Sequence, residues 1–72
     1  MLLADRLTDA QKVFEAHLAL FPEDADAYDN LGEIHHKAGR KDEAIASYKK
    51  SLALDPANTN AVKMLEKLGV KP

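Results

Sequence analysis

The sequence contains no cysteine and no tryptophan, and it has only three glycines and three prolines in 72 residues. Without cysteine, the chain can form neither a disulfide nor a thiolate-ligated zinc site. Its three glycines, Gly32, Gly39 and Gly69, are far apart, which excludes a glycine-rich phosphate-binding loop. The lack of cysteine carries no information about the compartment.

Long apolar runs and a large excess of one charge are also missing. No apolar run approaches the ~20 residues that span a bilayer, and residues 1–4 are too short for the core of a signal peptide. The net charge is −2, and no stripe of basic residues is present, which argues against nucleic acid as a partner. We expect a cytoplasmic protein, with a periplasmic protein whose signal has been removed as the alternative.

Apolar residues recur at helical spacing, and no segment alternates with a period of two, so the sequence predicts helices and no strands. Thr8 and Gln11 form a capping-box pattern, which places the start of the first helix at Thr8. Pro22 ends this helix near Leu20. Five residues of this helix are predicted to face inward: Ala10, Phe14, His17, Leu18 and Phe21.

Three further helices follow in the predicted pattern. The second begins near Asp24 and is followed by Gly39, which suits a left-handed residue after a last turn. The third covers residues 41–54. The fourth begins at Asn58 or Thr59 and is closed by Gly69.

Residues 34 positions apart match in type along the chain. Units of about this length that form a helix-turn-helix are typical of repeats that stack on one another, because one unit cannot bury its apolar face alone. The matching pairs are Ala10 and Ala44, Phe14 and Tyr48, Leu18 and Leu52, and Pro22 and Pro56.

The central segment resembles the tetratricopeptide repeat. Its pattern appears here as Tyr28, Leu31, Gly32, Ala44, Tyr48, Ser51 and Pro56. The resemblance implies an all-α, antiparallel helix-turn-helix superhelical stack of about four helices. It also implies a single domain over residues 1–72: a partial repeat at 1–24, a complete repeat at 25–58, and a capping helix and tail at 59–72. His35 departs from the family pattern, which usually has a large residue such as Tyr there, and His17 stands where a small residue is preferred.

Small residues mark the expected helix contacts. Gly32 and Ala44 are predicted to lie where two antiparallel helices press together, so that larger side chains there would strain the core by ~1–3 kcal/mol. Tyr28 and Tyr48 are predicted to fill the gap between one helix pair and the next.

Members of this family usually bind proteins and do no chemistry, so the resemblance implies a non-catalytic interaction module without a cofactor. The expected partner is a peptide or helix of another protein, held in the concave groove lined by the first helix of each repeat. Here that groove would comprise Asp26, Asp29, Asn30, Glu33, His36, Asn60, Lys63 and Lys67.

Charge in this groove restricts the partner. Some family members hold a C-terminal carboxylate with Lys, Asn and Arg, but Asp29 and Glu33 occupy two of the corresponding positions and would repel it. A partner segment of mixed or basic charge is therefore expected. Lys63 and Lys67 are predicted to pair with these two carboxylates across the stacked helices.

Two alternatives remain for the function. The chain is either a self-assembling element, forming a homodimer through apolar ends, or a detached C-terminal repeat module of a larger, bacterial protein. The end residues concerned are Leu2, Leu3, Leu7 and Val13 on one side, and Val62, Met64, Leu68 and Val70 on the other.

Asp29, Glu33 and His36 stand at i, i+4 and i+7 of one helix face, which is the pattern of a metal site but also of an ordinary solvated stripe. We expect the solvated stripe, and no metal. Neither Ser47 nor Ser51 belongs to an arrangement of nucleophile, base and orienting group, so no enzyme is expected.

Overall fold

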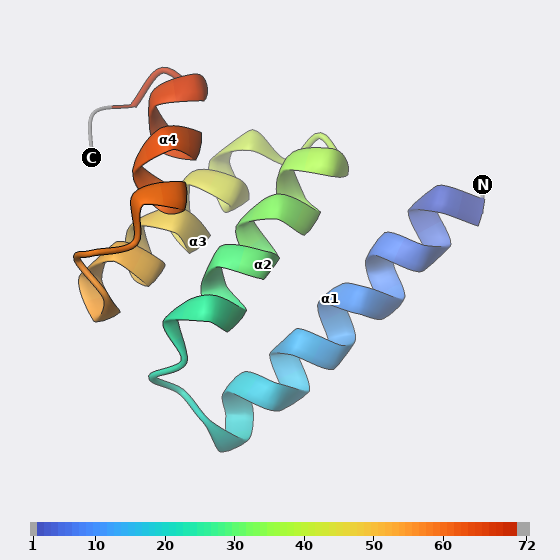
Figure 1. Cartoon of the computed structure of the whole chain (residues 1–72). Coiled ribbons are helices and arrows are strands. Elements are labelled where there is room, and N and C mark those ends of the chain that lie inside the picture. The colour runs from blue at the N-terminus through green and yellow to red at the C-terminus, as the bar shows by residue number, and fades with distance from the viewer. Residues whose placement is uncertain (1, 71–72) are drawn as a thin grey trace.

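A computed structural model of the chain describes the backbone of residues 2–70 and the side chains of residues 6–70. Four helices follow one another, and residues 2–70 contain no strand: α1 (Leu2–Leu20), α2 (Ala25–Lys37), α3 (Lys41–Leu54) and α4 (Thr59–Lys67). They form one antiparallel stack with α1 at one edge and α4 at the other (Figure 1). The predicted all-α fold is confirmed.

The boundaries of the helices follow from local chemistry. α1 ends shortly before Pro22, as predicted. The side chains of Asp24 and Asn58 accept hydrogen bonds from backbone amides in the first turns of α2 and α4, which satisfies donors that a helix start leaves free. Gly39 and Gly69 have φ angles of 79° and 83° after the ends of α2 and α4, a conformation that favours glycine.

The start of α1 differs from the prediction. The helix begins at Leu2, not at Thr8. The preceding residues 2–7 are mostly good helix formers without glycine or proline, so the helix continues through the capping pattern. Gln11, expected to bond back to the Thr8 amide, instead donates a side-chain hydrogen bond of 3.1 Å to Glu15.

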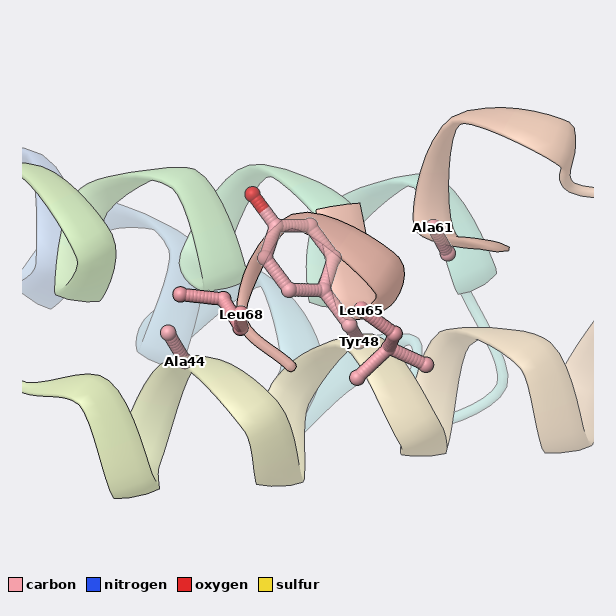
Figure 2. Packing of buried hydrophobic residues seen from close by; sticks show 5 residues of the cluster. All are labelled: Ala44, Tyr48, Ala61, Leu65 and Leu68. Carbon is pink, nitrogen blue, oxygen red and sulfur yellow. The ribbon is translucent and has the colours of Figure 1, made fainter. Parts of the chain in front are cut away.

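The core is built around Tyr48, which is 0% exposed. Its ring from α3 lies among Ala44, Leu65 of α4 and Leu68, which directly follows α4 (Figure 2). A Cβ atom added to Gly32 would lie 2.7–2.8 Å from three carbons of this ring. Glycine is therefore favoured where α2 meets Tyr48, which confirms the predicted packing role of Gly32, and Ala44 is buried in the same region.

His35, at the atypical position of the repeat, is buried and takes polar partners. Its Nδ1 atom lies 3.3 Å from a carboxylate oxygen of Glu43 and 3.4 Å from a guanidinium nitrogen of Arg40. Arg40 also donates a hydrogen bond to Gln11 of α1. This polar cluster joins α1, α2 and the start of α3.

The two ends of the stack differ, and the predicted exposure holds for only one of them. On α1, Val13 is 66% exposed, as predicted. Phe21, predicted to face inward, is 58% exposed, and Leu20 is 76% exposed; among the described helices, α1 makes extensive contacts only with α2. Leu7 is half-buried. The predictions for Leu2 and Leu3 lie outside the residues whose side chains are described.

At the other end, α4 closes the stack. Leu68, predicted to be exposed, is buried, and Met64 and Val70 pack against the Tyr48 cluster. The chain folds back after Gly69, where the amide of Val70 donates to the carbonyl of Leu65 at 2.9 Å. Apolar exposure at this end was therefore wrongly predicted, since the tail covers residues that the helix alone would leave open.

Candidate partner-binding surface

The predicted groove residues lie on the two helices expected to carry them. α2 carries Asp26, Asp29, Asn30, Glu33 and His36, and α4 carries Asn60, Lys63 and Lys67. Seven of these side chains are exposed, and Asp29 is half-buried.

Asp29 is the side chain that joins the two helices. Asn60 Nδ2 donates to both of its carboxylate oxygens, at 2.8 and 3.1 Å. Asn58 Nδ2 lies 3.3 Å from one of the same oxygens and 2.8 Å from Ser51 Oγ. Ser51 in turn donates to the Ala25 carbonyl at 2.8 Å. This network fixes the Asp29 carboxylate and holds α2, α3 and α4 together on one side of the stack.

The predicted ion pairs across the groove do not form. Among residues 6–70, neither Lys63 nor Lys67 has an ion-pair partner. Asp29 is instead occupied by Asn60, whose short amide reaches it directly, and Glu33 pairs with Lys37 on its own helix at 3.2 Å. Exposed pairs of this type contribute only ~0.2–1 kcal/mol, so both lysines and Glu33 are available to a partner.

Negative charge from this surface reaches the core. Burial, together with the carboxylates of Asp29 and Glu33, raises the pKa of Tyr48 to about 12. The Tyr48 hydroxyl is buried and has no hydrogen-bond partner among the described residues. It therefore stays neutral beneath an acidic part of α2.

The candidate metal ligands do not come together. Within the part of the chain that the structure describes, no three His, Asp or Glu side chains are placed to hold a metal ion. Asp29, Glu33 and His36 form an acidic and polar stripe along α2, and Asp29 is engaged by amide groups of α4 and of the residue before it.

Two clefts lie beside α1, in a region that the sequence did not mark as a site. A cleft of about 520 Å³ surrounds the exposed end of α1, and a second of about 240 Å³ lies between α1 and α2. His17 and Asp24 line both. The larger cleft is lined by His17, Leu20, Phe21, Pro22, Glu23 and Asp24.

His17 and Asp24 are bonded to each other at this place. His17 Nε2 lies 2.6 Å from Asp24 Oδ2. This bond lowers the pKa of Asp24, and backbone amides of α2 lower it further. The 34-residue repeat could have revealed the pair, since His17 and Asp24 correspond to Ser51 and Asn58, which are also bonded.

None of the described helices is both long and apolar enough to cross a membrane.

The structure is a stack of helix-turn-helix units with a polar surface over α2 and α4. Such a structure belongs to the class of helical-repeat proteins, which present surfaces to other molecules.

Comparison with known proteins gives the family. The tetratricopeptide repeat family matches residues 4–59, and the chain belongs to it. A relative described as "Hsp70-Hsp90 organizing protein", from Triticum aestivum, is 44% identical over 55 residues, which is 76% of this chain. The matched part is 9% of the length of the wheat protein. Tetratricopeptide repeats are in general protein-protein interaction modules and are typically not catalytic.

Proposed function

We propose that this chain binds a segment of another protein through the surface formed by α2 and α4, and that it does so without catalysis. The supporting observation is the pair of carboxylates on α2, with Asp29 fixed by Asn60 at 2.8 Å and Glu33 held only by an exposed pair with Lys37. A fixed carboxylate loses little freedom when it accepts a further bond, which favours recognition.

The charges on this surface favour a partner of mixed or basic character. Asp26, Asp29 and Glu33 present carboxylates along α2, and Lys63 and Lys67 present ammonium groups along α4. A basic partner residue would face α2, and an acidic one would face α4. A segment that ends in a bare carboxylate over Asp29 would be repelled.

The wheat relative suggests two proteins to test. The name of that protein connects it with Hsp70 and Hsp90. This chain corresponds to 9% of the wheat protein, and we propose Hsp70 and Hsp90 as candidate partners to test. The small share of the wheat protein that is matched also suits a module that acts as part of a larger protein, which we propose as an alternative. We further propose that the protein is bacterial and cytoplasmic.

The test is a binding titration with Glu33→Lys. Purified Hsp70 and Hsp90, and fluorescent peptides of basic, mixed and acidic composition, would be titrated against the native chain and the variant. We expect mixed or basic peptides to bind the native chain more tightly than acidic ones, and Glu33→Lys to reverse that order. Glu15→Lys is the control, since Glu15 is exposed on α1 and changes the net charge equally. Equal effects of the two substitutions would contradict the proposed surface.

Self-assembly is the second candidate, and the exposed Val13, Leu20 and Phe21 favour it. Contiguous apolar patches often mark interfaces. Light scattering over a wide range of concentrations tests it. A constant monomer mass would exclude it.

A further inference from the structure

The exposed face of α1 corresponds to a face that is covered in the complete repeat. Phe14 and His17 lie 34 residues before Tyr48 and Ser51. In the complete repeat, α2 covers both positions: Gly32 approaches the Tyr48 ring, and the Ala25 carbonyl accepts a hydrogen bond from Ser51.

The difference in burial shows that α1 has no such cover. Tyr48 and Ser51 are both 0% exposed, whereas Phe14 is half-buried and the side chain of His17 is 39% exposed. Val13 and Leu20, both exposed, flank these residues. On the α1 side, the 240 Å³ cleft between α1 and α2 is lined by Val13, Phe14 and His17. A helix that packs on α1 as α2 packs on α3 would fill this cleft.

The polar edge of the same face defines the charge of that helix. Asn58 and Asn60 donate hydrogen bonds to Asp29, which lies on the preceding helix. The corresponding residues beside α1 are Asp24 and Asp26, and carboxylates can only accept hydrogen bonds. A helix covering α1 must therefore present a hydrogen-bond donor where α2 presents Asp29, and a cation matches the two negative charges best.

The local geometry of the two places is otherwise alike. The bond between His17 and Asp24 measures 2.6 Å, and the corresponding bond between Asn58 and Ser51 measures 2.8 Å. Asp24 and Asn58 both cap the following helix. The spacing seen on α2 between Asp29 and Gly32 can therefore be transferred to the covering helix.

In the complete repeat, a tight turn connects the covering helix α2 to α3, and α1 has no such turn at the corresponding residues. α2 connects to α3 through Gly39 and Arg40, and the corresponding residues are Asp5 and Arg6. Both of these are helical in α1, and Asp5 stands where the repeat has a glycine with a φ angle of 79°. A helix on this face is therefore not supplied through a tight turn at these positions.

A second copy of this chain does not provide a matching helix. α4 has Lys63 at the position of Asp29, which would suit Asp24 and Asp26. However, it has Glu66 at the position of Gly32, where even a Cβ atom would come within 2.8 Å of the Tyr48 ring. α2 itself has the small residue but carries Asp29, which the two carboxylates would repel.

We propose that the cleft between α1 and α2 binds an amphipathic helix of a different protein, antiparallel to α1, with Lys or Arg three residues before Gly. The small residue lies against Phe14, the cation lies between Asp24 and Asp26, and apolar residues cover Val13 and Leu20. This surface lies at the open edge of the stack. It shares Asp26 and Asn30 with the surface over α2 and α4, whereas Glu33 does not line the cleft.

A peptide based on α2 tests the proposal directly. The probe has residues 22–38 of this chain with Asp29→Lys, with blocked ends, and it is titrated into the native chain by fluorescence anisotropy. Two matched peptides serve as controls: one keeps Asp29, and the other combines Asp29→Lys with Gly32→Leu. We expect the probe to bind about fivefold or more tightly than either control.

Protein variants locate the binding. Val13→Glu should abolish binding of the probe without unfolding the chain, since Val13 is exposed. Asp26→Lys should reverse the preference, so that the peptide with Asp29 binds better than the probe. Glu33→Lys should leave probe binding unchanged, which distinguishes this face from the surface proposed above.

Three results would overturn the proposal. Equal binding of the probe and the peptide that retains Asp29 would show that the charges on α2 do not select the helix. Absence of binding by all three peptides would show that the face takes no such helix. A concentration-dependent dimer that Val13→Glu abolishes would show that a second copy occupies the face instead.

Discussion

Replacement of Gly32 by alanine tests the packing of the whole stack. The added Cβ atom would lie 2.7 Å from two carbons of the Tyr48 ring and 2.8 Å from a third. Carbon atoms in van der Waals contact are ~3.5–4.0 Å apart, so either the ring or α2 must move by about 1 Å. The ring is 0% exposed and is packed against Ala44, Leu65 and Leu68, which leaves it no free direction.

Two opposing effects determine the size of the change. Overpacking of a filled core typically costs ~1–3 kcal/mol. Alanine is intrinsically better than glycine inside a helix by ~0.8–1 kcal/mol, and Gly32 lies within α2. Because the overlap is large and the ring is enclosed, we expect a net destabilisation of about 1–2 kcal/mol. For a domain of this size, that corresponds to a melting temperature lower by roughly 5–15 °C.

Urea unfolding followed by circular dichroism measures this effect. Asn30→Ala is the control on the same helix, since Asn30 is exposed and should change stability by no more than ~0.5 kcal/mol. In a Tyr48→Leu background, which removes the ring, Gly32→Ala should become neutral or stabilising. An unfolding midpoint of Gly32→Ala at or above the native value would refute the reasoning.

Three other predictions concern the same core. The pKa of Tyr48 is raised to about 12 from ~10 in the unfolded chain; stability is therefore full below pH ~10 and falls by about 1–3 kcal/mol as the pH rises towards the folded-state pKa. The urea midpoint of the native chain should therefore be lower near the folded-state pKa than at pH ~10, and the midpoint of Tyr48→Phe should lack this decrease. An equal dependence of the two midpoints on pH would contradict the assignment to Tyr48. Ser51→Ala removes the bonds to Ala25 and Asn58 and should cost ~1–3 kcal/mol in the same assay, whereas no change would mean that water replaces them. Leu65→Ala, at a side chain that is 0% exposed, should cost ~2–5 kcal/mol, and a value below about 1 kcal/mol would show that the cluster collapses around the gap.

The sequence predicted most of the fold because its helix boundaries depend on local chemistry. Pro22, Asp24, Gly39 and Gly69 each act within a few residues of their own position, and the structure has the helix ends where they indicate. The start of α1 was wrong for a related reason. The capping pattern at Thr8 is local too, but it competes with the helix propensity of residues 2–7, which precede it. The sequence does not show whether capping at Thr8 or continuation of the helix is more favourable.

Side-chain partners across the groove were harder to predict. Lys63 and Lys67 have the right charge to meet Asp29 and Glu33, but Asn60 reaches Asp29 first. Choosing between them requires the distance between α2 and α4, which Gly32 and Tyr48 determine together. The site residues themselves remain a prediction.

The order of the packed helices has a consequence for motion. Extensive contacts join only helices that are adjacent in sequence, and the largest interface is the one between α2 and α3. The cluster around Tyr48 contains no residue of α1, so α1 can detach while the rest of the stack stays folded. We expect amide hydrogens of α1 to exchange with solvent much faster than those of α2 and α3. A helix bound beside α1 would slow that exchange, so ordering of this edge would itself report that the cleft is occupied.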